Sequence, residues 1–378
     1  MPLSEQLRVA IRVDASAQIG TGHLQRMLAL AFALNERGAA LHFVTRSLGL
    51  DCKTAIHKKG FNQVTMLDAP HQAIEEDGLV PHSAWAQVPW QKDVADTVQA
   101  LDDWSPDWVI IDSYAFDARW HLAVEEALGA RIAVVDDLAD RALAASVLID
   151  HNFHIDHRKK YAGRLGDGAV LCTGPEFAMI DQVYASTKRY SFREEVRSIG
   201  IFMGGADAQG HSFEVLDALD RMGWQGRVEI ASTSANPALS KLQARAKLRA
   251  RTELTLDQPN LANFFARHDL QIGAGGGATW ERCCIGAPTL ALVCADNQRF
   301  NIPFLADAGV LVALDMLADD QASRRRLVHN LASAIASIIA APGKRADMHK
   351  LSQLLIDGLG TFRIADAIFD LSEGYINL

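Results

Sequence analysis

A histidine stands in a glycine-rich turn near the start of the chain, in the stretch Gly20-Thr21-Gly22-His23. The β-branched run RVAIRVD precedes the turn and a helical pattern follows it, so we expect His23 at the N-terminus of a helix. The helix dipole disfavours an imidazolium there and favours a neutral ring near pH 7. Most histidines only satisfy a hydrogen bond, but a neutral imidazole directed into a cleft can act as a general base. His23 is therefore a candidate catalytic residue.

A second glycine-rich stretch, IGAGGGATWERCCIGAP at residues 272–288, also follows an apolar run. Glycines let a backbone approach a ligand closely, and the helix after them offers free N–H groups to phosphate. Neither loop continues into GK[ST], and GxGxxG does not follow the first run, so ATP-driven chemistry and an NAD cofactor are disfavoured. Two such loops on either side of a cleft indicate a ligand that carries a diphosphate.

The acidic residues beside these loops could have either a ligand-binding role or a purely structural one. Glu281 lies on a helix that Thr279 or a neighbour is expected to cap, and it could accept ribose hydroxyls or only stabilise the helix dipole. From the residues alone, the second role is the more frequent one. Asp136 and Asp137 end the run RIAVVDDL, typical of a strand-end turn that also points at the cleft. We interpret Arg282 as a surface charge.

The elements that must position these residues form an α/β pattern. Near-continuous apolar runs, typical of strands buried on both faces of a parallel sheet, alternate with helical patterns such as residues 24–37, which Gly38 closes. The series stops at the polar segment 181–197 and restarts with SIGIFMGGADAQG. This predicts two Rossmann-like parallel-sheet domains that face each other across a cleft, with ligand loops at the carboxyl ends of the strands. Residues 66–95 are interpreted as a long excursion near the cleft or a plain surface loop.

The totals exclude several classes of protein. The chain has 378 residues, a net charge of −9 and five scattered cysteines. The charge argues against nucleic acid or an anionic membrane as partner. The cysteines indicate reduced thiols in the cytoplasm, and no signal peptide or membrane-spanning run is present. The spacing of His151, His154 and His157 fits no zinc pattern and indicates a solvated loop, so no metal is expected.

Seven motifs in this order resemble the PseG family of UDP-2,4-diacetamido-2,4,6-trideoxy-β-L-altropyranose hydrolases, whose fold is related to that of MurG. They are IRVDASAQIGTGHLQRMLALA, VIIDSYAFDARW, IAVVDDLADR, LIDHN, TGPEFAMI, IFMGGAD and GAGGGATWERCCIGAPTLALVCADNQ. The resemblance covers residues 8 to about 300. The sequence departs from the family pattern at Asp181, where the family has Leu-Arg-Pro, and at Gly210, where it often has asparagine.

The resemblance implies a GT-B architecture that binds a small-molecule UDP-sugar and hydrolyses it with water, without a metal or any other cofactor. It places the sugar and the catalytic residues in an N-terminal domain 1–180, a linker at 181–197, UDP in a C-terminal domain 198–350, and helices that cross back at 351–378. The implied catalytic residues are His23, Tyr114 and Asn297. The predicted substrate-binding residues are Asp14, Gly20, Thr21, Gly22, Gly204, Gly205, Gly275, Gly276, Gly277, Thr279, Glu281 and Gln298, and the resemblance itself implies Glu281 as the residue that contacts the nucleotide.

Two other functions stay open at this stage. A GT-B glycosyltransferase would use His23 to activate an acceptor hydroxyl in place of water. A non-catalytic nucleotide-sugar binding protein would bind UDP tightly without turnover. The sequence does not indicate the oligomeric state.

Overall fold

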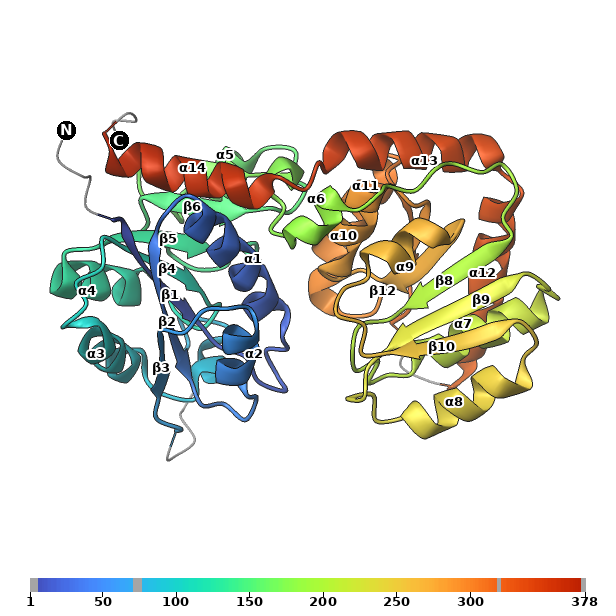
Figure 1. Cartoon of the computed structure of the whole chain (residues 1–378), viewed down its shortest axis with the longest axis horizontal. Coiled ribbons are helices and arrows are strands. Elements are labelled where there is room, and N and C mark those ends of the chain that lie inside the picture. The colour runs from blue at the N-terminus through green and yellow to red at the C-terminus, as the bar shows by residue number, and fades with distance from the viewer. Residues whose placement is uncertain (1–5, 71–76, 318–320, 375–378) are drawn as a thin grey trace. The chain divides into compact units, whose positions relative to one another are not determined.

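The computed structural model describes residues 6–70, 77–317 and 321–374. The chain divides into two compact units, which we call the N-terminal unit (Met1–Asp181 with Leu359–Leu378) and the C-terminal unit (Gln182–Gly358). Each unit is built on one parallel sheet with helices on both faces (Figure 1). No helix in the described ranges is long and apolar enough to cross a membrane.

The N-terminal unit holds a seven-stranded sheet in the order β3-β2-β1-β4-β5-β6-β7, in which all pairs are parallel. The strands are β1 (Arg8–Val13), β2 (Ala40–Arg46), β3 (Val64–Leu67), β4 (Trp108–Asp112), β5 (Arg131–Val135), β6 (Val147–Asp150) and β7 (Val170–Thr173). The helices are α1 (Gly22–Glu36), α2 (Cys52–Lys58), α3 (Trp90–Leu101), α4 (Ala118–Leu128), α5 (His157–Lys160) and α14 (Gly360–Ser372), with short 3-10 turns η1 (Ser83–Ala86) and η2 (Pro175–Phe177).

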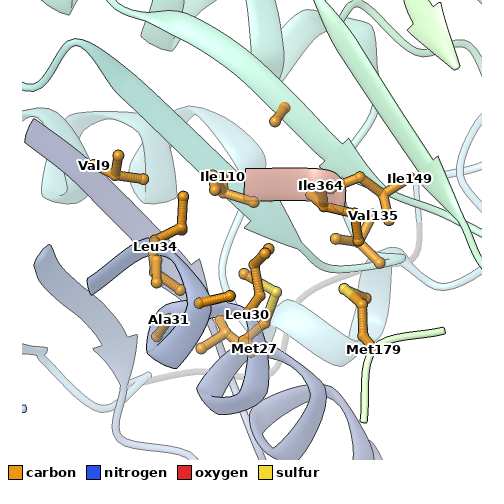
Figure 2. Packing of buried hydrophobic residues seen from close by; sticks show 14 of the residues in the cluster. Val9, Met27, Leu30, Ala31, Leu34, Ile110, Val135, Ile149, Met179 and Ile364 are labelled. Atoms are coloured by element: carbon orange, nitrogen blue, oxygen red, sulfur yellow. The ribbon is translucent and has the colours of Figure 1, made fainter. Parts of the chain in front are cut away.

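Strand alternation explains why both faces of this sheet are apolar. Side chains two residues apart on β1, such as Val9 and Ile11, join the core under α1 and α14, whereas Ala10 joins the core on the opposite face. Figure 2 shows the first of these cores, where Leu30 of α1 and Ile364 of α14 meet the strands. Near-continuous apolar strands are therefore required here, because each residue of a central strand is covered on one face or the other.

The last helix of the chain completes the N-terminal core. Ile364, Ile368 and Leu371 of α14 are buried together with residues of α1. Gly360 begins this helix so close to η2 that a Cβ atom would lie 2.5 Å from the backbone nitrogen and oxygen of Ala178. Only a residue without a side chain allows this approach.

Gly360→Ala is expected to destabilise the N-terminal unit by about 1–3 kcal/mol, because backbone atoms of Phe177 and Ala178 must move away from the new methyl group. The measurement is urea unfolding of the full chain. Gly343→Ala is the matched control: it lies in α13 (Pro342–Leu355) with nothing within 4 Å of a built Cβ, so it should be neutral or slightly stabilising. Equal midpoints for the two variants would contradict the packing argument.

The C-terminal unit holds a six-stranded parallel sheet in the order β10-β9-β8-β11-β12-β13. Its strands are β8 (Ser198–Phe202), β9 (Arg227–Ser232), β10 (Thr252–Leu256), β11 (Leu270–Ala274), β12 (Thr289–Val293) and β13 (Val312–Asp315). The remaining elements are α6 (Gln182–Ser186), α7 (His211–Arg221), α8 (Leu239–Leu248), α9 (Ala262–Arg267), α10 (Ala278–Ile285), η3 (Asp296–Phe300), α11 (Ile302–Asp307) and α12 (Gln321–Ile339).

Both sheets reverse their strand order at one point, next to the first strand of the unit. In the N-terminal unit β1 lies between β2 and β4, and in the C-terminal unit β8 lies between β9 and β11. Connections from the two central strands leave in opposite directions there, which opens a crevice at the carboxyl ends of the strands. The topology therefore brings the β1–α1 loop beside the end of β4, and the β8–α7 loop beside the β11–α10 loop.

Part of the expected excursion at residues 66–95 is regular structure. Met66 and Leu67 belong to β3, and α3 begins at Trp90. Residues 77–89 contain the 3-10 turn η1, and residues 71–76 lie outside the described part of the chain. The excursion is thus shorter than the sequence pattern indicated. The three prolines and two tryptophans interrupt the periodicity, so the end of β3 and the start of α3 were not recognisable.

Candidate functional site

His23 is the second residue of α1, directly after the loop that leaves β1. Thr21 is the N-cap residue of this helix, but its side chain makes no capping hydrogen bond. Gly20 closes the loop by donating its N–H to the carbonyl oxygen of Ser16 over 2.8 Å. Thr21 and Gly22 are exposed, whereas the His23 side chain is only 11% exposed. The loop therefore leaves an exposed backbone in front of a nearly buried imidazole.

The carboxylate of Asp112 holds the His23 ring. Asp112 is the last residue of β4, it is fully buried, and its Oδ1 lies 2.6 Å from His23 Nδ1. A carboxylate can only accept, so Nδ1 carries the proton in this contact and the lone pair of the neutral ring is on Nε2. Asp112 thus fixes both the orientation and the tautomer that a general base needs.

Arg26 keeps Asp112 ionised. It follows His23 by three residues on α1, and donates from Nε to Asp112 Oδ2 and from Nη2 to Oδ1, both at 2.6 Å. Burial alone would raise the pKa of Asp112, but Arg26 in the first place and His23 in the second hold it well below its usual range. The same guanidinium lies 3.6 Å from Asp137 Oδ2. Arg26 therefore joins Asp112, which ends β4, to Asp137, which lies in the loop after the neighbouring strand β5.

Tyr114 is brought to the same place from the β4–α4 loop. Its ring meets the His23 ring edge-on with 4.7 Å between centroids, and its hydroxyl donates to Asp137 Oδ1 over 2.5 Å. Burial and the nearby Asp137 raise the pKa of Tyr114 well above its usual value. The phenol proton is thus committed to Asp137, and the Tyr114 oxygen faces other groups as a hydrogen-bond acceptor.

Two aromatic rings from the shortened excursion lie against Tyr114. His82 and Trp85 are 5.9 Å and 6.0 Å from the Tyr114 ring centroid and 4.6 Å from each other. The excursion therefore supplies part of the wall around Tyr114 in the N-terminal unit.

Asp14 has a different setting from the other predicted residues of this unit. It follows β1, is 4% exposed, and its Oδ1 accepts from Arg12 Nη1 at 2.5 Å and from the Arg46 N–H at 2.7 Å. These contacts tie the end of β1 to the end of β2.

The glycine loop after β11 is open on one side. Gly276 and Gly277 are exposed, Gly277 is the N-cap residue of α10, and no side chain caps this helix within the described residues. The sequence expectation that Thr279 could be the cap is wrong: Thr279 lies inside the first turn, fully buried. Glu281 lies in the first turn and is half-buried, which leaves both of its readings open.

The loop after β8 differs, because its helix is already capped. Asp207 accepts from the N–H groups of His211 at 2.9 Å and Ser212 at 3.1 Å, so two of the first N–H groups of α7 are occupied. Gly204 and Gly205 precede this cap and are half-buried, and the Gly205 carbonyl accepts from the Thr233 hydroxyl. Of the two glycine loops in this unit, the one after β11 is the better anion site.

His211, which directly follows Gly210, carries a charge at the start of α7. Its Nδ1 lies 2.6 Å from Glu214 Oε2. Burial opposes protonation, but contacts with Cys294 and Glu214 raise the pKa of His211 to about 10. Gly210 has φ +76°, a left-handed conformation that glycine and asparagine tolerate best, which accounts for the departure from the family asparagine.

The residues predicted after β12 lie in η3. The Gln298 side chain accepts the N–H of Cys294 over 2.8 Å, and its Oε1 would be 3.2 Å from a Cβ on Gly275. Gln298 therefore supports the glycine loop from behind. Asn297 belongs to η3, but its side chain lies outside the described part of the chain.

Two sequence interpretations are wrong. Arg282 is not a surface charge but is fully buried on α10. His151 is not in a solvated loop: it is 7% exposed, and burial first and Arg26 second lower its pKa to about 4. Both errors have one cause, since a polar residue was assumed to face solvent.

The structure also identifies site residues that the sequence analysis did not select. Asp112 and Arg26 form the centre of the N-terminal cluster, and Asp137, noted as a strand-end residue, joins it through Tyr114. Two signals could have pointed to them. A carboxylate ends the otherwise apolar run WVIID, and Arg26 stands three residues after His23, on the same helix face.

No protein-family model matches the chain. Two curated proteins are similar to it along most of its length. The spore coat polysaccharide biosynthesis protein SpsG of Bacillus subtilis is 21% identical over 370 residues, 97% of this chain and 99% of that protein. The UDP-2,4-diacetamido-2,4,6-trideoxy-beta-L-altropyranose hydrolase of Campylobacter jejuni is 23% identical over 304 residues, 80% of this chain and 97% of the hydrolase.

Solved structures establish the architecture. MurG of Acinetobacter baumannii superimposes with a TM-score of 0.65 at 15% identity, covering 96% of this chain and 99% of MurG. The fold is GT-B. The spinosyn rhamnosyltransferase SpnG, in complex with spinosyn aglycone, has a TM-score of 0.64 at 16% identity and covers 97% of this chain and all of that protein. At these identities the likeness concerns the fold alone.

Proposed function

We propose that this chain is a UDP-sugar hydrolase that releases UDP from a 2,4-diacetamido-2,4,6-trideoxyhexose of the altrose type. The observation that carries the proposal is the contact between His23 Nδ1 and Asp112, which leaves a fixed Nε2 lone pair beside Tyr114. The name of the Campylobacter jejuni relative supports this reaction and this sugar class. The wider statement, an enzyme of UDP-sugars, is also supported by the GT-B fold.

His23 acts as the base. Its Nε2 removes one proton from water while the water oxygen bonds to the anomeric carbon of the sugar. The bond between that carbon and the β-phosphate oxygen breaks, and its electron pair leaves with UDP. The products are the free sugar and UDP, and His23 keeps the proton until solvent accepts it. Asp112 stabilises the imidazolium during this step, as a buried carboxylate does in a catalytic triad.

Tyr114 orients the same water molecule. Because its own proton is donated to Asp137, the phenol oxygen accepts the second water hydrogen. The two acceptors, His23 Nε2 and Tyr114 Oη, thus direct a water lone pair away from themselves and toward the sugar. Asn297 retains its proposed role as a further contact of this water, on the strength of the family resemblance.

The C-terminal unit binds the leaving group in this proposal. The backbone N–H groups at Gly276 and Gly277 and the N-terminus of α10 stabilise the charge that develops on the diphosphate. Glu281 accepts the ribose hydroxyls, and Gln298 keeps the glycine loop in place through its bond to Cys294. Gly204 and Gly205 form the second backbone wall next to the nucleotide.

The experiment is ³¹P NMR of UDP release from the UDP-linked diacetamido-altrose, with UDP-N-acetylglucosamine as the control substrate. We expect UDP from the first compound only, without any added acceptor. Tight UDP binding without release from either compound would contradict the hydrolase and favour the nucleotide-sugar binding protein.

One observation favours glycosyl transfer as a second candidate. The N-terminal unit contains a pocket of about 450 Å³, between residues 77–91 and the start of α4. Its wall is apolar at Val88 and Ala115 and polar at Arg119, which suits an organic acceptor molecule. UDP release that requires an added acceptor alcohol, with a new glycoside in the product, would support transfer instead of hydrolysis.

A further inference from the structure

Arg282 is a buried cation that forms no ion pair with a carboxylate among the described residues. It is fully buried on α10, and Nη2 donates to the Ala274 carbonyl at 2.9 Å and the Thr279 hydroxyl at 3.1 Å. Its Nε and Nη1 have no hydrogen-bond partner in the described part of the chain, and no ion pair reaches it there. The Phe265 ring also lies near the guanidinium, with its centroid 6.0 Å from the guanidinium carbon.

This arrangement is costly, because a buried charge normally requires a paired group of opposite sign. Burial lowers the pKa of Arg282 to about 10, although nearby Glu281 and the two cysteines Cys283 and Cys294 oppose the shift. The side chain is therefore still a cation at neutral pH.

The neighbouring strand is shaped to admit this side chain. A Cβ atom on Gly273, in β11, would overlap Arg282 Nη1 and would lie 2.5 Å from the Phe202 carbonyl oxygen. The guanidinium thus occupies the space that a side chain at position 273 would fill, directly behind the glycine loop.

On the exposed side of the same loop, backbone N–H groups have no acceptor among the described residues. Gly276 and Gly277 are exposed, and the N–H groups of Gly276, Gly277 and Ala278 meet no acceptor among the described residues. Three free donors, the uncapped N-terminus of the eight-residue α10 and a buried cation behind them all favour negative charge at one position.

We infer that Arg282 is a positioning residue for an anion: its charge, acting through the glycine loop, attracts the diphosphate group of the ligand to the N–H groups of Gly276–Ala278. The inference rests on the proposed function for the identity of the ligand as UDP. The chemistry that it requires is wider, since any diphosphate would be attracted. In this inference the negative charge that balances Arg282 is supplied by the bound ligand.

The test compares Arg282→Gln with Arg282→Lys in the full chain, by calorimetric titration with UDP, uridine and inorganic pyrophosphate. Gln keeps a donor for Ala274 but loses the charge, so UDP and pyrophosphate affinity should fall about 10- to 100-fold while uridine affinity stays within twofold. Lys keeps the charge and should retain most of the UDP affinity. Arg197→Gln removes an exposed charge of the same unit (its side chain is 76% exposed) and should change nothing.

Three results would overturn the inference. Unchanged UDP affinity in a folded Arg282→Gln variant would remove the electrostatic role. An equal loss for uridine and UDP, or an equal loss in the Lys variant, would make Arg282 a structural support of the loop. Failure of the proposed function would give a different result. If the chain releases no UDP but its pyrophosphate affinity still depends on Arg282, the hydrolase proposal is wrong and the anion site is supported.

Discussion

His23→Asn is expected to lower the rate of UDP release by about 10²- to 10⁴-fold, the usual contribution of a positioned general base. Asparagine can still donate to Asp112, but it offers no basic nitrogen to water. The UDP affinity should change little, because the nucleotide contacts proposed here belong to the C-terminal unit. The measurements are kcat from UDP release and Kd for UDP by calorimetry.

Two further variants sharpen this prediction. Asp112→Asn should lose activity to a similar extent, because an amide no longer fixes the Nδ1–H tautomer of His23. The double variant should be little worse than either single variant, since the two residues act as one unit. His57→Asn, an exposed histidine of α2 in the same unit, is the matched control and should retain full activity. Activity near the wild-type rate in His23→Asn would exclude this histidine as the base.

Asp93→Leu is expected to destabilise the N-terminal unit by about 3–5 kcal/mol, the cost of removing one partner from a buried ion pair. Asp93 lies on α3 with no exposed surface, and it accepts from Arg12 and Arg46 over 2.7 Å each. Both arginine side chains are 1% exposed. The leucine variant would leave two guanidinium groups buried without this carboxylate, and it would also remove the acceptor of the Trp120 indole N–H.

Urea unfolding of the full chain, followed by tryptophan fluorescence, measures this loss. Asp102→Leu, at the exposed C-terminal end of α3, is the control and should shift the free energy of unfolding by less than about 0.5 kcal/mol. A loss below about 1 kcal/mol for Asp93→Leu would mean that Asp14 and Asp96 compensate both arginines without it.

The central strands could be predicted from the sequence, and three edge strands could not. β1, β4, β8 and β11 are buried on both faces, so their residues form apolar runs that are easy to recognise. β3, β7 and β10 have four or five residues, are partly exposed, and contain threonine. A short half-exposed strand has no distinctive pattern, because only one face of it must be apolar.

The candidate site was predictable for residues whose type suggests chemistry by itself, and not for residues that act by holding another side chain. His23 and Tyr114 lie in the family motifs, and the structure brings their rings together. Asp112 and Arg26 lie in the same two motifs, but Asp112 is separated from His23 by 89 residues, and only the strand order places β4 beside β1. Arg282 was predicted to be exposed and is buried. Nothing in the neighbouring sequence indicates which side of α10 faces the sheet.

The return of α14 to the N-terminal unit has a consequence for how the protein is made. The residues Gln182–Gly358, 177 in number, are synthesised between the two parts of the N-terminal unit. At about 5–20 residues per second, a ribosome needs roughly 10–35 s for this stretch. During that time the part of α1 that contacts α14 in the folded unit has no covering helix. The N-terminal unit thus cannot complete its core until the whole C-terminal unit has been synthesised.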